Sequence, residues 1–395
     1  MEERQRYRLA VATGTRAEYG LLRPVLKKLN CDDAFDLRLY VTGSHLSEAF
    51  GSTVDEIEAD GMPIAARLDI LSAEVPSGRA GTAVRTQMAL ELFLAAFMED
   101  KPDCLLLLGD RYEALAASLA ASLLNLPVAH ISGGEVTWGA DDNWYRHCIS
   151  KMAKLHFPSC EMYRQRLLRM GEQPGRVYNV GGLGDENIRN MVLPDRNTLA
   201  ENLGIPHTGP FALVTYHPET ATGHSVAQQA DALLRAIEQH PELFYLFTGA
   251  NADAGGSELN ARYAAFCVQR TNCALFSSLG TLRYLGAMKE ASLVLGNSSS
   301  GVVETPSLGT PTVNIGMRQH GRMICENVLC CDIDAGQIDA AIKEALTPAF
   351  REKARLVKSP YNGGDTSGRI VTVLKENLAG GWLRGPKTFY DGEGA

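Results

Sequence analysis

The chain has 395 residues, against about 150 for a usual single domain, so we expect two domains with separate cores. Hydrophobic residues make up 45% and charged residues 21% of the sequence, a globular composition that excludes disorder as its main character. The 38 Lys and Arg against 46 Asp and Glu leave a net charge of −8 with no basic block, so the sequence predicts no nucleic-acid partner.

Segments that would direct the chain into a membrane or out of the cell are not expected. The apolar run at residues 9–12 breaks at Gly14 and is too short for a signal peptide. The most apolar stretch, residues 114–131, contains Asn125 and Pro127, as a buried helix, turn and strand would. The sequence therefore predicts a cytoplasmic protein with no membrane partner.

Short runs rich in Val, Leu, Ile and aromatic residues recur along the chain, each followed by a Gly or polar turn and then a helical pattern. This order is typical of parallel α/β sheets. In the first half we predict strands at residues 7–13, 35–41, 104–108, 128–131, 154–158 and 177–180. In the second half we predict strands at residues 211–216, 244–248, 274–276, 293–295, 312–315 and 328–332. Two Rossmann-like, doubly wound halves are thus expected in tandem.

The linker between the halves is expected at residues 193–210, which hold three prolines and turn residues around a short helix. We place the first domain at residues 1–190 and the second at residues 209–364. A helix is predicted at 365–380, and the Gly-rich segment after it is expected to be loosely held because little in it could form a core. Ligands bind at the carboxyl ends of such sheets, so we expect the chemistry in a cleft shared by both domains.

A Gly turn follows the first predicted strand and opens a helix. The N–H groups that begin this helix, together with the charge of Arg16, predict an anion site. Gly14 also has a steric alternative, because turns between a strand and a helix often need Gly. The turn lacks the dinucleotide-binding Gly pattern and no P-loop sequence occurs, so NAD and P-loop sites lose support.

Titratable groups follow the next predicted strands. Asp110 comes directly after residues 104–108 and is a candidate for catalysis or, alternatively, only for a helix cap. After the strand at 128–131 come Glu135, Asp141, Asp142, Arg146 and His147. Groups that converge at neighbouring strand ends are how acid–base pairs with separated pKa values are assembled. Taken singly, each has a structural alternative as a cap or a satisfied core residue.

The second half presents similar candidates. His217 follows its first strand and is weak evidence alone. Residues 296–301, Gly-Asn-Ser-Ser-Ser-Gly, open a helix that carries Glu304. The N–H and hydroxyl donors of residues 296–301 suit a diphosphate, and the Glu304 carboxylate suits ribose hydroxyls. Arg318 and Arg322 are candidates for phosphate contacts or solvated loop charges. The nine Cys and nine His show no metal-ligand spacing, so no metal site is predicted.

With these motifs the chain resembles the hydrolysing UDP-N-acetylglucosamine 2-epimerases of sialic-acid and related nonulosonate biosynthesis. The resemblance covers nearly the whole chain and rests on residues 13–19 (TGTRAEY), 109–111 (GDR), 133–135 (GGE), 146–147 (RH), 217–218 (HP), 296–301 (GNSSSG), 304–306 (ETP) and 318–319 (RQ). It implies two α/β domains of glycosyltransferase-B type, with UDP held mainly by the second domain. It also implies a C-terminal helix packed back on the first domain and a homo-oligomer.

In the reaction that the resemblance implies, a base removes the hydrogen on sugar carbon 2. UDP leaves carbon 1, and water adds to the resulting glycal with inversion at carbon 2. No cofactor is required. Because no carbonyl acidifies the hydrogen on carbon 2, the bond from carbon 1 to UDP must break ahead of the loss of that hydrogen. Carboxylates would stabilise the oxocarbenium character that results.

Site residues are carried over from the resemblance position by position. Asp110, Asp142 and His217 lie on catalytic positions, and Glu135 and His147 complete the catalytic candidates. The substrate-binding candidates are Arg16, His45, Arg111, Ser132, Asp141, Asn251, Asn297, Ser298, Ser299, Gly301, Glu304, Arg318 and Arg322.

Two departures from the family pattern concern the sugar side. Ser132 stands where the family commonly has a catalytic Glu before Gly-Gly-Glu, and Asn143 replaces the usual second Asp of an Asp-Asp pair. Both changes remove carboxylates, and Glu135 is the obvious replacement base. Trp144 and Tyr145 replace smaller or aliphatic residues and would reshape the sugar pocket.

The sequence thus predicts a hydrolysing 2-epimerase acting on UDP-N-acetylglucosamine or on a 6-deoxy diacetamido relative such as UDP-diacetylbacillosamine. One alternative is a glycosyltransferase of the same architecture, which the carboxylates after the first-domain strands disfavour. Another is a catalytically lapsed UDP-sugar-binding protein, suggested by Ser132 and Asn143. Turnover to UDP and free sugar separates the enzymes, and binding without turnover selects the lapsed protein.

Overall fold

The computed structural model describes residues 6–47, 53–71, 75–76, 78–138, 142–206, 208–219, 223–250 and 255–392. The chain forms two compact units. Unit 1 comprises Met1–Glu135, Asp141–Asn187 and Gly363–Ala395, and unit 2 comprises Val136–Ala140 and Ile188–Asn362. The chain therefore enters unit 2 twice and returns to unit 1 at its C-terminal end.

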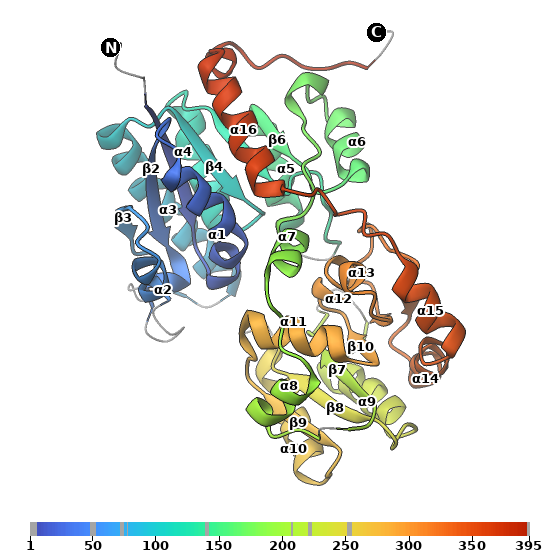
Figure 1. Cartoon of the computed structure of the whole chain (residues 1–395). Coiled ribbons are helices and arrows are strands. Elements are labelled where there is room, and N and C mark those ends of the chain that lie inside the picture. The colour runs from blue at the N-terminus through green and yellow to red at the C-terminus, as the bar shows by residue number, and fades with distance from the viewer. Residues whose placement is uncertain are drawn as a thin grey trace. The chain divides into compact units, whose positions relative to one another are not determined.

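Unit 1 is a parallel six-stranded sheet in the order β3-β2-β1-β4-β5-β6, with helices on both faces (Figure 1). Its strands are β1 (Tyr7–Thr13), β2 (Phe35–Thr42), β3 (Ile64–Leu68), β4 (Cys104–Leu108), β5 (Val128–Ile131) and β6 (Leu155–Phe157). Its helices and 3-10 turns are α1 (Arg16–Cys31), η1 (Gly43–Leu46), α2 (Val54–Ala59), α3 (Gly78–Asp100), α4 (Tyr112–Leu123), α5 (Asp142–Met152), α6 (Glu161–Arg169), η3 (Pro174–Arg176), α16 (Thr366–Ala379) and η4 (Trp382–Arg384). The strand order reverses between β1 and β4, which is where ligands bind in doubly wound sheets.

The strand β1 shows how the sequence builds both cores of unit 1. Successive side chains of a strand point to opposite faces. Leu9 and Val11 join one core with α1 and α16, whereas Ala10 and Ala12 join the other core with α3 and α4. All of β1 from Leu9 onward is buried, as a central parallel strand requires.

Unit 2 repeats the plan with the strand order β12-β11-β10-β7-β8-β9. Its strands are β7 (Phe211–Thr215), β8 (Phe244–Thr248), β9 (Cys273–Phe276), β10 (Leu293–Gly296), β11 (Thr312–Ile315) and β12 (Val328–Cys331). Its helices are α8 (Arg196–Leu203), α9 (Val226–Ile237), α10 (Gly256–Val268), α11 (Gly280–Glu290), α12 (Ser300–Val303), α13 (Thr305–Leu308), α14 (Ala335–Ala345) and α15 (Pro348–Leu356), and α7 (Leu183–Asn190) spans the boundary between the units. The predicted fold class, two tandem doubly wound parallel-sheet units, is confirmed.

The predicted strands fail in two places. β1, β4, β5, β8 and β11 begin and end at the predicted residues. The strand predicted at 177–180 is wrong, because only a single bridge from Val177 to His156 forms there. Conversely, β3 has no apolar run to predict it: it is an edge strand whose side chains are mostly half-buried or exposed, so its hydrophobic signal is weak.

The C-terminal part of the chain is held more firmly than its composition predicts. Asp365 caps α16 by accepting the N–H of Gly368 at 3.1 Å, and the helix packs on α1 within unit 1. The expectation of a loosely held segment after α16 is wrong. Lys387 donates to three main-chain carbonyls, and the N–H of Tyr390 donates to the carbonyl of Gly171 at 2.8 Å.

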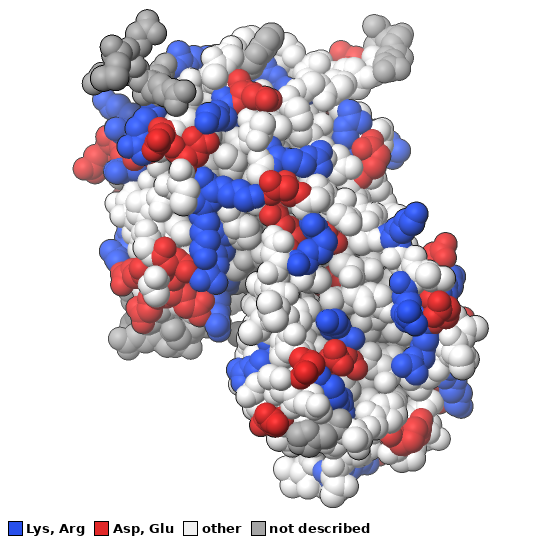
Figure 2. All heavy atoms as spheres, in the orientation of Figure 1, with Lys and Arg blue, Asp and Glu red and all other residues white. Residues whose placement is uncertain are grey.

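The charged side chains are mixed over the surface. On the face drawn in Figure 2, Lys and Arg lie among Asp and Glu over both units. In the parts of the chain that the structure describes, none of the helices has the length and hydropathy of a membrane span.

Candidate active site

The turn between β1 and α1 is closed by a capping box. Thr15 Oγ1 accepts the N–H of Glu18 at 3.3 Å, and Glu18 Oε2 accepts the N–H groups of Gly14 at 2.8 Å and Thr15 at 3.1 Å. Arg16 is exposed and pairs with Glu56 at 2.8 Å. The N–H groups of Gly14, Thr15 and Glu18 are thus bonded within the turn, and the anion site at the start of α1 stays a prediction.

Sequence motifs do not indicate two carboxyl groups near this turn, those of Glu18 and Glu113. Glu113, 3% exposed, accepts two hydrogen bonds from Arg111 at 2.9 and 3.2 Å. Burial raises the pKa of Glu18 to about 7; the charge of Arg111 opposes this change and the charge of Glu113 adds to it. A carboxyl group that titrates near neutral pH suits acid–base chemistry. In the sequence, Thr15 and Glu18 indicate only a capping box, and Glu113 looks like any acidic residue in a first helical turn.

His45 has a structural role in this structure. Its ring is fully buried, with Nε2 3.1 Å from Thr13 Oγ1 and Nδ1 2.7 Å from Thr53 Oγ1. Burial lowers its pKa to about 4, so the imidazole is neutral near pH 7. Both nitrogens have protein partners, which ties the end of β1 to the start of α2.

Asp110 follows β4 and forms an ion pair with Arg146 of α5. The Arg146 side chain is 4% exposed and that of Asp110 is 20% exposed. A guanidinium buried this deeply needs a carboxylate partner, so the pair fixes Asp110 at the carboxyl edge of the sheet. The alternative role as a cap is not supported, because the N-cap of α4 is Arg111.

His130, at the end of β5, joins three elements. Its Nε2 lies 2.7 Å from the carbonyl oxygen of Gly109, which precedes Asp110, and its Nδ1 lies 3.0 Å from Ser150 Oγ on α5. The ring is fully buried, and burial lowers its pKa to about 3. A neutral His130 therefore links the ends of β4 and β5 to α5.

The turn after β5 is strained. Ser132 has φ of +63°, a left-handed conformation that is costly for a residue with a Cβ. A Cβ on Gly133 would lie 2.9 Å from Ser150 Oγ, and one on Gly134 would lie 2.5 Å from the Tyr163 carbonyl oxygen. The two glycines thus let the turn approach α5 and α6 closely, and backbone strain of this kind clusters at functional sites.

The acidic candidates after β5 and on α5 are Glu135, Asp141 and Asp142. Glu135 Oε1 accepts a hydrogen bond from Ser159 Oγ at 3.1 Å. Asp142 is exposed in the first turn of α5, where the helix dipole favours a carboxylate. Asp141 lies outside the described residues, as does Asn251 in unit 2.

His147 lies on α5 next to Arg146 and is half-buried. Burial lowers its pKa, and the charges of Arg146 and Arg166 lower it further. Within the described residues, its Nδ1 is buried without a hydrogen-bond partner. A neutral imidazole with an open nitrogen can accept a proton or a hydrogen bond, and a catalytic role for His147 stays a prediction.

In unit 2, Asn297 holds the main chain of His217. The fully buried Asn297 side chain accepts the N–H of His217 at 2.7 Å and donates to its carbonyl oxygen at 2.8 Å. This approach needs Gly296, with φ of +140°, because a Cβ there would lie 2.0 Å from the Thr215 carbonyl oxygen. The loops after β7 and β10 are therefore joined as one structure.

Glu219 joins a third loop to this structure, and the sequence gives it no distinct signal. Its side chain accepts the N–H groups of Met317 at 3.2 Å and Arg318 at 3.0 Å. The Arg318 guanidinium and the Gln319 amide both donate to the Asn297 carbonyl oxygen, at 3.1 and 2.8 Å. The loop after β11 thus carries Arg318 to the same edge of the sheet as His217.

This edge combines a neutral histidine with the positive charge of Arg318. Burial, aided by the charge of Arg318, lowers the pKa of His217 to about 4, so His217 is neutral near pH 7. Arg318 is half-buried, and its charge is part of this edge. Arginine in such a place suits phosphate recognition.

The helix predicted to carry Glu304 is broken at that residue. Glu304 lies between α12 and α13 as the C-cap of the first and the N-cap of the second, and Pro306 lies in the first turn of α13. Burial raises the pKa of Tyr284 on α11, the nearby charge of Glu304 adds to this, and hydrogen bonds with Thr215, Ser300 and Ser298 oppose it. Ser298 and Ser299 are half-buried and Gly301 is buried in the same segment. Tyr284 is a polar member of this cluster that sequence motifs do not indicate.

Arg322 contacts a segment that follows Glu135 in sequence but belongs to unit 2. Its guanidinium donates to Thr137 Oγ1 at 3.3 Å, and the rings of Trp138 and His320 lie 6.0 Å apart. A Cβ on Gly321 would lie 2.3 Å from Val136, so this glycine is needed for the contact. Arg322 is thus engaged with protein rather than solvated.

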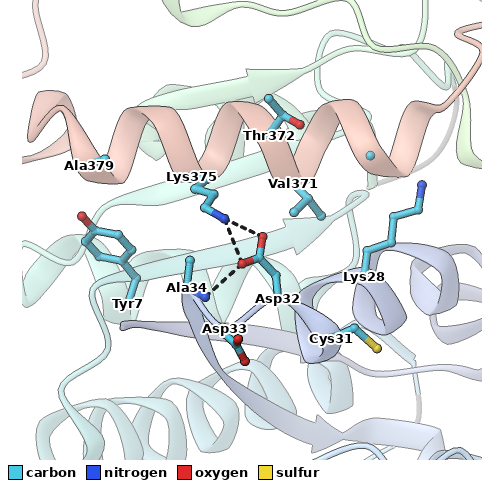
Figure 3. Close-up of a pocket in the computed structure, with 11 residues that line it drawn as sticks. Tyr7, Lys28, Cys31, Asp32, Asp33, Ala34, Val371, Thr372, Lys375 and Ala379 are labelled. Carbon is cyan, nitrogen blue, oxygen red and sulfur yellow. Dashed lines mark hydrogen bonds and ion pairs between the residues drawn. The ribbon is translucent and has the colours of Figure 1, made fainter. Parts of the chain in front are cut away.

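A cavity of about 840 Å³ lies elsewhere, between α16 and the start of β1 (Figure 3). It opens at the amino ends of the strands, beside Tyr7 and Ala34. Lys375 is paired with both oxygens of Asp32 at 2.9 Å there. The predicted site residues are absent from its lining.

The structure brings the candidates together in two sets. In unit 1, Asp110, Arg111, Ser132, Glu135 and His147 lie at or near the ends of β4 and β5 and on α5. In unit 2, His217, Asn297, Glu304 and Arg318 lie at the ends of β7, β10 and β11. Within the described residues, no group of three or more His, Cys, Asp or Glu is arranged to hold a metal ion.

Comparison with known proteins gives one family. A family model described as UDP-N-acetylglucosamine 2-epimerase matches residues 27–375. GDP/UDP-N,N'-diacetylbacillosamine 2-epimerase (hydrolyzing) from Campylobacter jejuni is 35% identical and covers 94% of this chain and 96% of its own. UDP-N,N'-diacetylbacillosamine 2-epimerase (hydrolyzing) from Legionella pneumophila is 33% identical and covers 93% of this chain and 95% of its own.

A solved structure has the same fold. The UDP-GlcNAc 2-epimerase from Neisseria meningitidis bound to UDP-GlcNAc matches with a TM-score of 0.80 and 19% identity, over 94% of this chain and 100% of that chain. The match confirms the predicted glycosyltransferase-B type architecture of two Rossmann-like units.

Proposed function

Because this chain belongs to the UDP-N-acetylglucosamine 2-epimerase family, we propose that it is a hydrolysing 2-epimerase of a UDP-2-acetamido sugar. The match of the family model over residues 27–375 carries the proposal. The substrate we favour is a UDP-diacetylbacillosamine-type sugar, because two relatives more than 30% identical over nearly the whole chain bear that name. UDP-N-acetylglucosamine is the second substrate to test.

The proposed reaction balances as an elimination followed by a hydration. A base takes the proton from carbon 2 while the bond from carbon 1 to the UDP oxygen breaks, and the electron pair of the C–H bond forms the glycal double bond. Water then adds its oxygen to carbon 1, and a proton returns to carbon 2 from the opposite face. The products are UDP and the free 2-epimeric sugar.

Unit 1 supplies the carboxyl groups that this chemistry needs. Asp110, fixed by Arg146, is the first candidate for charge stabilisation or proton transfer. Glu135 is the proposed base in place of the carboxylate that Ser132 lacks, and Asp142 is its proposed partner. Glu18, with a pKa of about 7, is a further carboxyl group able to exchange a proton near neutral pH.

Unit 2 supplies the proposed UDP site. Asn297 fixes the loop that carries His217, and Glu219 fixes the loop that carries Arg318. We assign the diphosphate to Arg318 and the Ser298–Ser299 loop, and the ribose to Glu304. Stabilising the departing UDP lowers the barrier to bond cleavage at carbon 1.

Release of UDP from a panel of UDP-amino sugars tests the proposal, with UDP-diacetylbacillosamine and UDP-N-acetylglucosamine as the main members. We expect turnover of at least one of them and its loss in Glu135→Gln, with UDP affinity kept. Transfer of the sugar to an acceptor instead of water would select the glycosyltransferase, and binding without turnover would select the lapsed protein. A cytoplasmic location and a homo-oligomer stay predictions, which cell fractionation and light scattering test.

A further inference from the structure

The segment that follows α16 returns to the far end of α5. Lys387 donates to the carbonyl oxygens of Ser150 at 3.2 Å, Lys151 at 2.8 Å and Ala153 at 2.6 Å. These belong to the last turn of α5 and the residue after it, where a helix leaves its carbonyl groups unsatisfied. A cation at this position satisfies them and complements the helix dipole.

The Lys387 ammonium is embedded in a charged network. It lies 2.6 Å from Glu172 Oε2, and Glu172 also accepts from His156 at 2.9 Å and Lys151 at 2.8 Å. The side chains of Glu172 and Lys387 are 2% and 23% exposed. Burial lowers the pKa of Lys387, while the hydrogen bond to Glu172 opposes that change. A partly buried pair of this kind holds its geometry better than a surface ion pair.

Neighbouring contacts fix the segment on both sides of Lys387. The Lys154 ammonium donates to the carbonyl oxygens of Leu383 at 2.9 Å and Gly385 at 2.8 Å. The Phe389 ring lies against Gly171, where a Cβ would come within 2.3 Å of two ring atoms. The segment, the red trace beyond α16 in Figure 1, is therefore attached to the loops after α5 and α6.

The same helix α5 also contacts the candidate active site, through Arg146 in its middle and Ser150 in its last turn. Arg146 pairs with Asp110, and Ser150 contacts the His130 ring that binds the carbonyl of Gly109. A helix transmits a displacement of one end to the other because its internal hydrogen bonds make it stiff. Loss of the contacts at the end of α5 would therefore shift the Arg146 guanidinium against Asp110.

We propose that Lys387 is a positioning residue: it fixes α5 from its C-terminal end so that Arg146 and Ser150 hold Asp110 in place for catalysis. This rests on the proposed function, in which Asp110 takes part in the chemistry. Among the residues that the structure describes, Lys387 contacts main-chain carbonyls at the end of α5 and Glu172, and none of the candidate catalytic groups. Its effect should therefore fall on kcat rather than on the binding of UDP by unit 2.

The test compares K387M with K375M in the full-length chain. Both remove one ammonium from the C-terminal part, but Lys375 pairs with Asp32 at the end of α1 (Figure 3). In K387M we expect kcat for the UDP-sugar to fall roughly tenfold with KM changed less than twofold, because small misplacements of catalytic groups are costly. K375M should keep kcat, and K387R, which retains a cation, should recover most of the loss.

Hydrogen–deuterium exchange of the α5 amides provides the readout that does not depend on activity. We expect faster exchange in residues 142–152 of K387M and no change there in K375M. Unchanged kcat and exchange in K387M, or equal losses in K375M, would overturn the proposal. If the wild-type chain turns over no UDP-sugar, the proposed function fails, while the exchange data alone still decide whether Lys387 fixes α5. Should K387M not fold, K387Q, which removes the positive charge but keeps a donor for one carbonyl oxygen, gives the same comparison, and unchanged exchange in residues 142–152 of K387Q would overturn the proposal.

Discussion

Acid should destabilise unit 1 through the neutral, buried His130. Its folded-state pKa of about 3 lies below the 6.5 of an ordinary imidazole, so the unfolded chain binds more protons between these two values. Stability is therefore fully present above about pH 6.5 and is lost as the pH falls toward 3. Between pH 7 and pH 5 the linkage amounts to about 2 kcal/mol for a single such residue.

The variant His130→Gln isolates this contribution. It keeps a donor for the Gly109 carbonyl oxygen but cannot titrate, so contributions from His45 and His217 cancel in the comparison. Urea denaturation at pH 7 and pH 5 should show that the wild-type free energy of unfolding falls by about 2 kcal/mol more than that of the variant. His224→Gln, at an exposed side chain, is the matched control. An equal loss in His130→Gln and wild type would refute the reasoning.

Three further predictions concern single residues of the two sets. Asp110→Asn should cut UDP release by a factor on the order of a hundred or more while calorimetry shows unchanged UDP affinity, and near-normal turnover would make Asp110 structural. Arg318→Ala should weaken UDP binding by about tenfold, because a charged hydrogen bond to the ligand is lost; unchanged affinity in calorimetry would remove Arg318 from the site. Ser132→Gly should raise the free energy of unfolding by about 1 kcal/mol in urea titrations, since Gly adopts a positive φ without strain; a loss of stability would mean that the Ser132 side chain stabilises the turn.

The sequence predicts most of the fold because buried parallel strands leave continuous apolar runs. β4, with the sequence CLLLL, begins and ends where that run predicts. β3 escapes prediction because an edge strand needs no such run. The apolar residues at 177–180 predict a strand that does not form. Val177 is buried after a 3-10 turn but pairs with the sheet only once, at His156.

The candidate site is predicted in its positions but not in its contacts. Strand ends point to Asp110 and Arg318 as candidates because ligands bind there in doubly wound sheets, and their roles stay predictions. Several contacts of the site depend on residues far apart in sequence. They are the pairing of Asp110 with Arg146, the charges that act on the pKa of Glu18, and the hydrogen bonds from the Arg318 loop to Glu219. No local pattern encodes such contacts. Composition also misjudges the C-terminal segment, because much of its attachment rests on the ammonium groups of Lys154 and Lys387 and on main-chain carbonyls.

The central claim is that UDP leaves by elimination and that water adds to a glycal. Turnover of the UDP-sugar in deuterated water, followed by proton NMR of the released sugar, tests it most directly. The account predicts a free sugar with inverted configuration at carbon 2 and deuterium in place of the original hydrogen, because that hydrogen is removed before water adds. A sugar that retains the original hydrogen at carbon 2, or its original configuration, would contradict the account and indicate simple glycosyl hydrolysis.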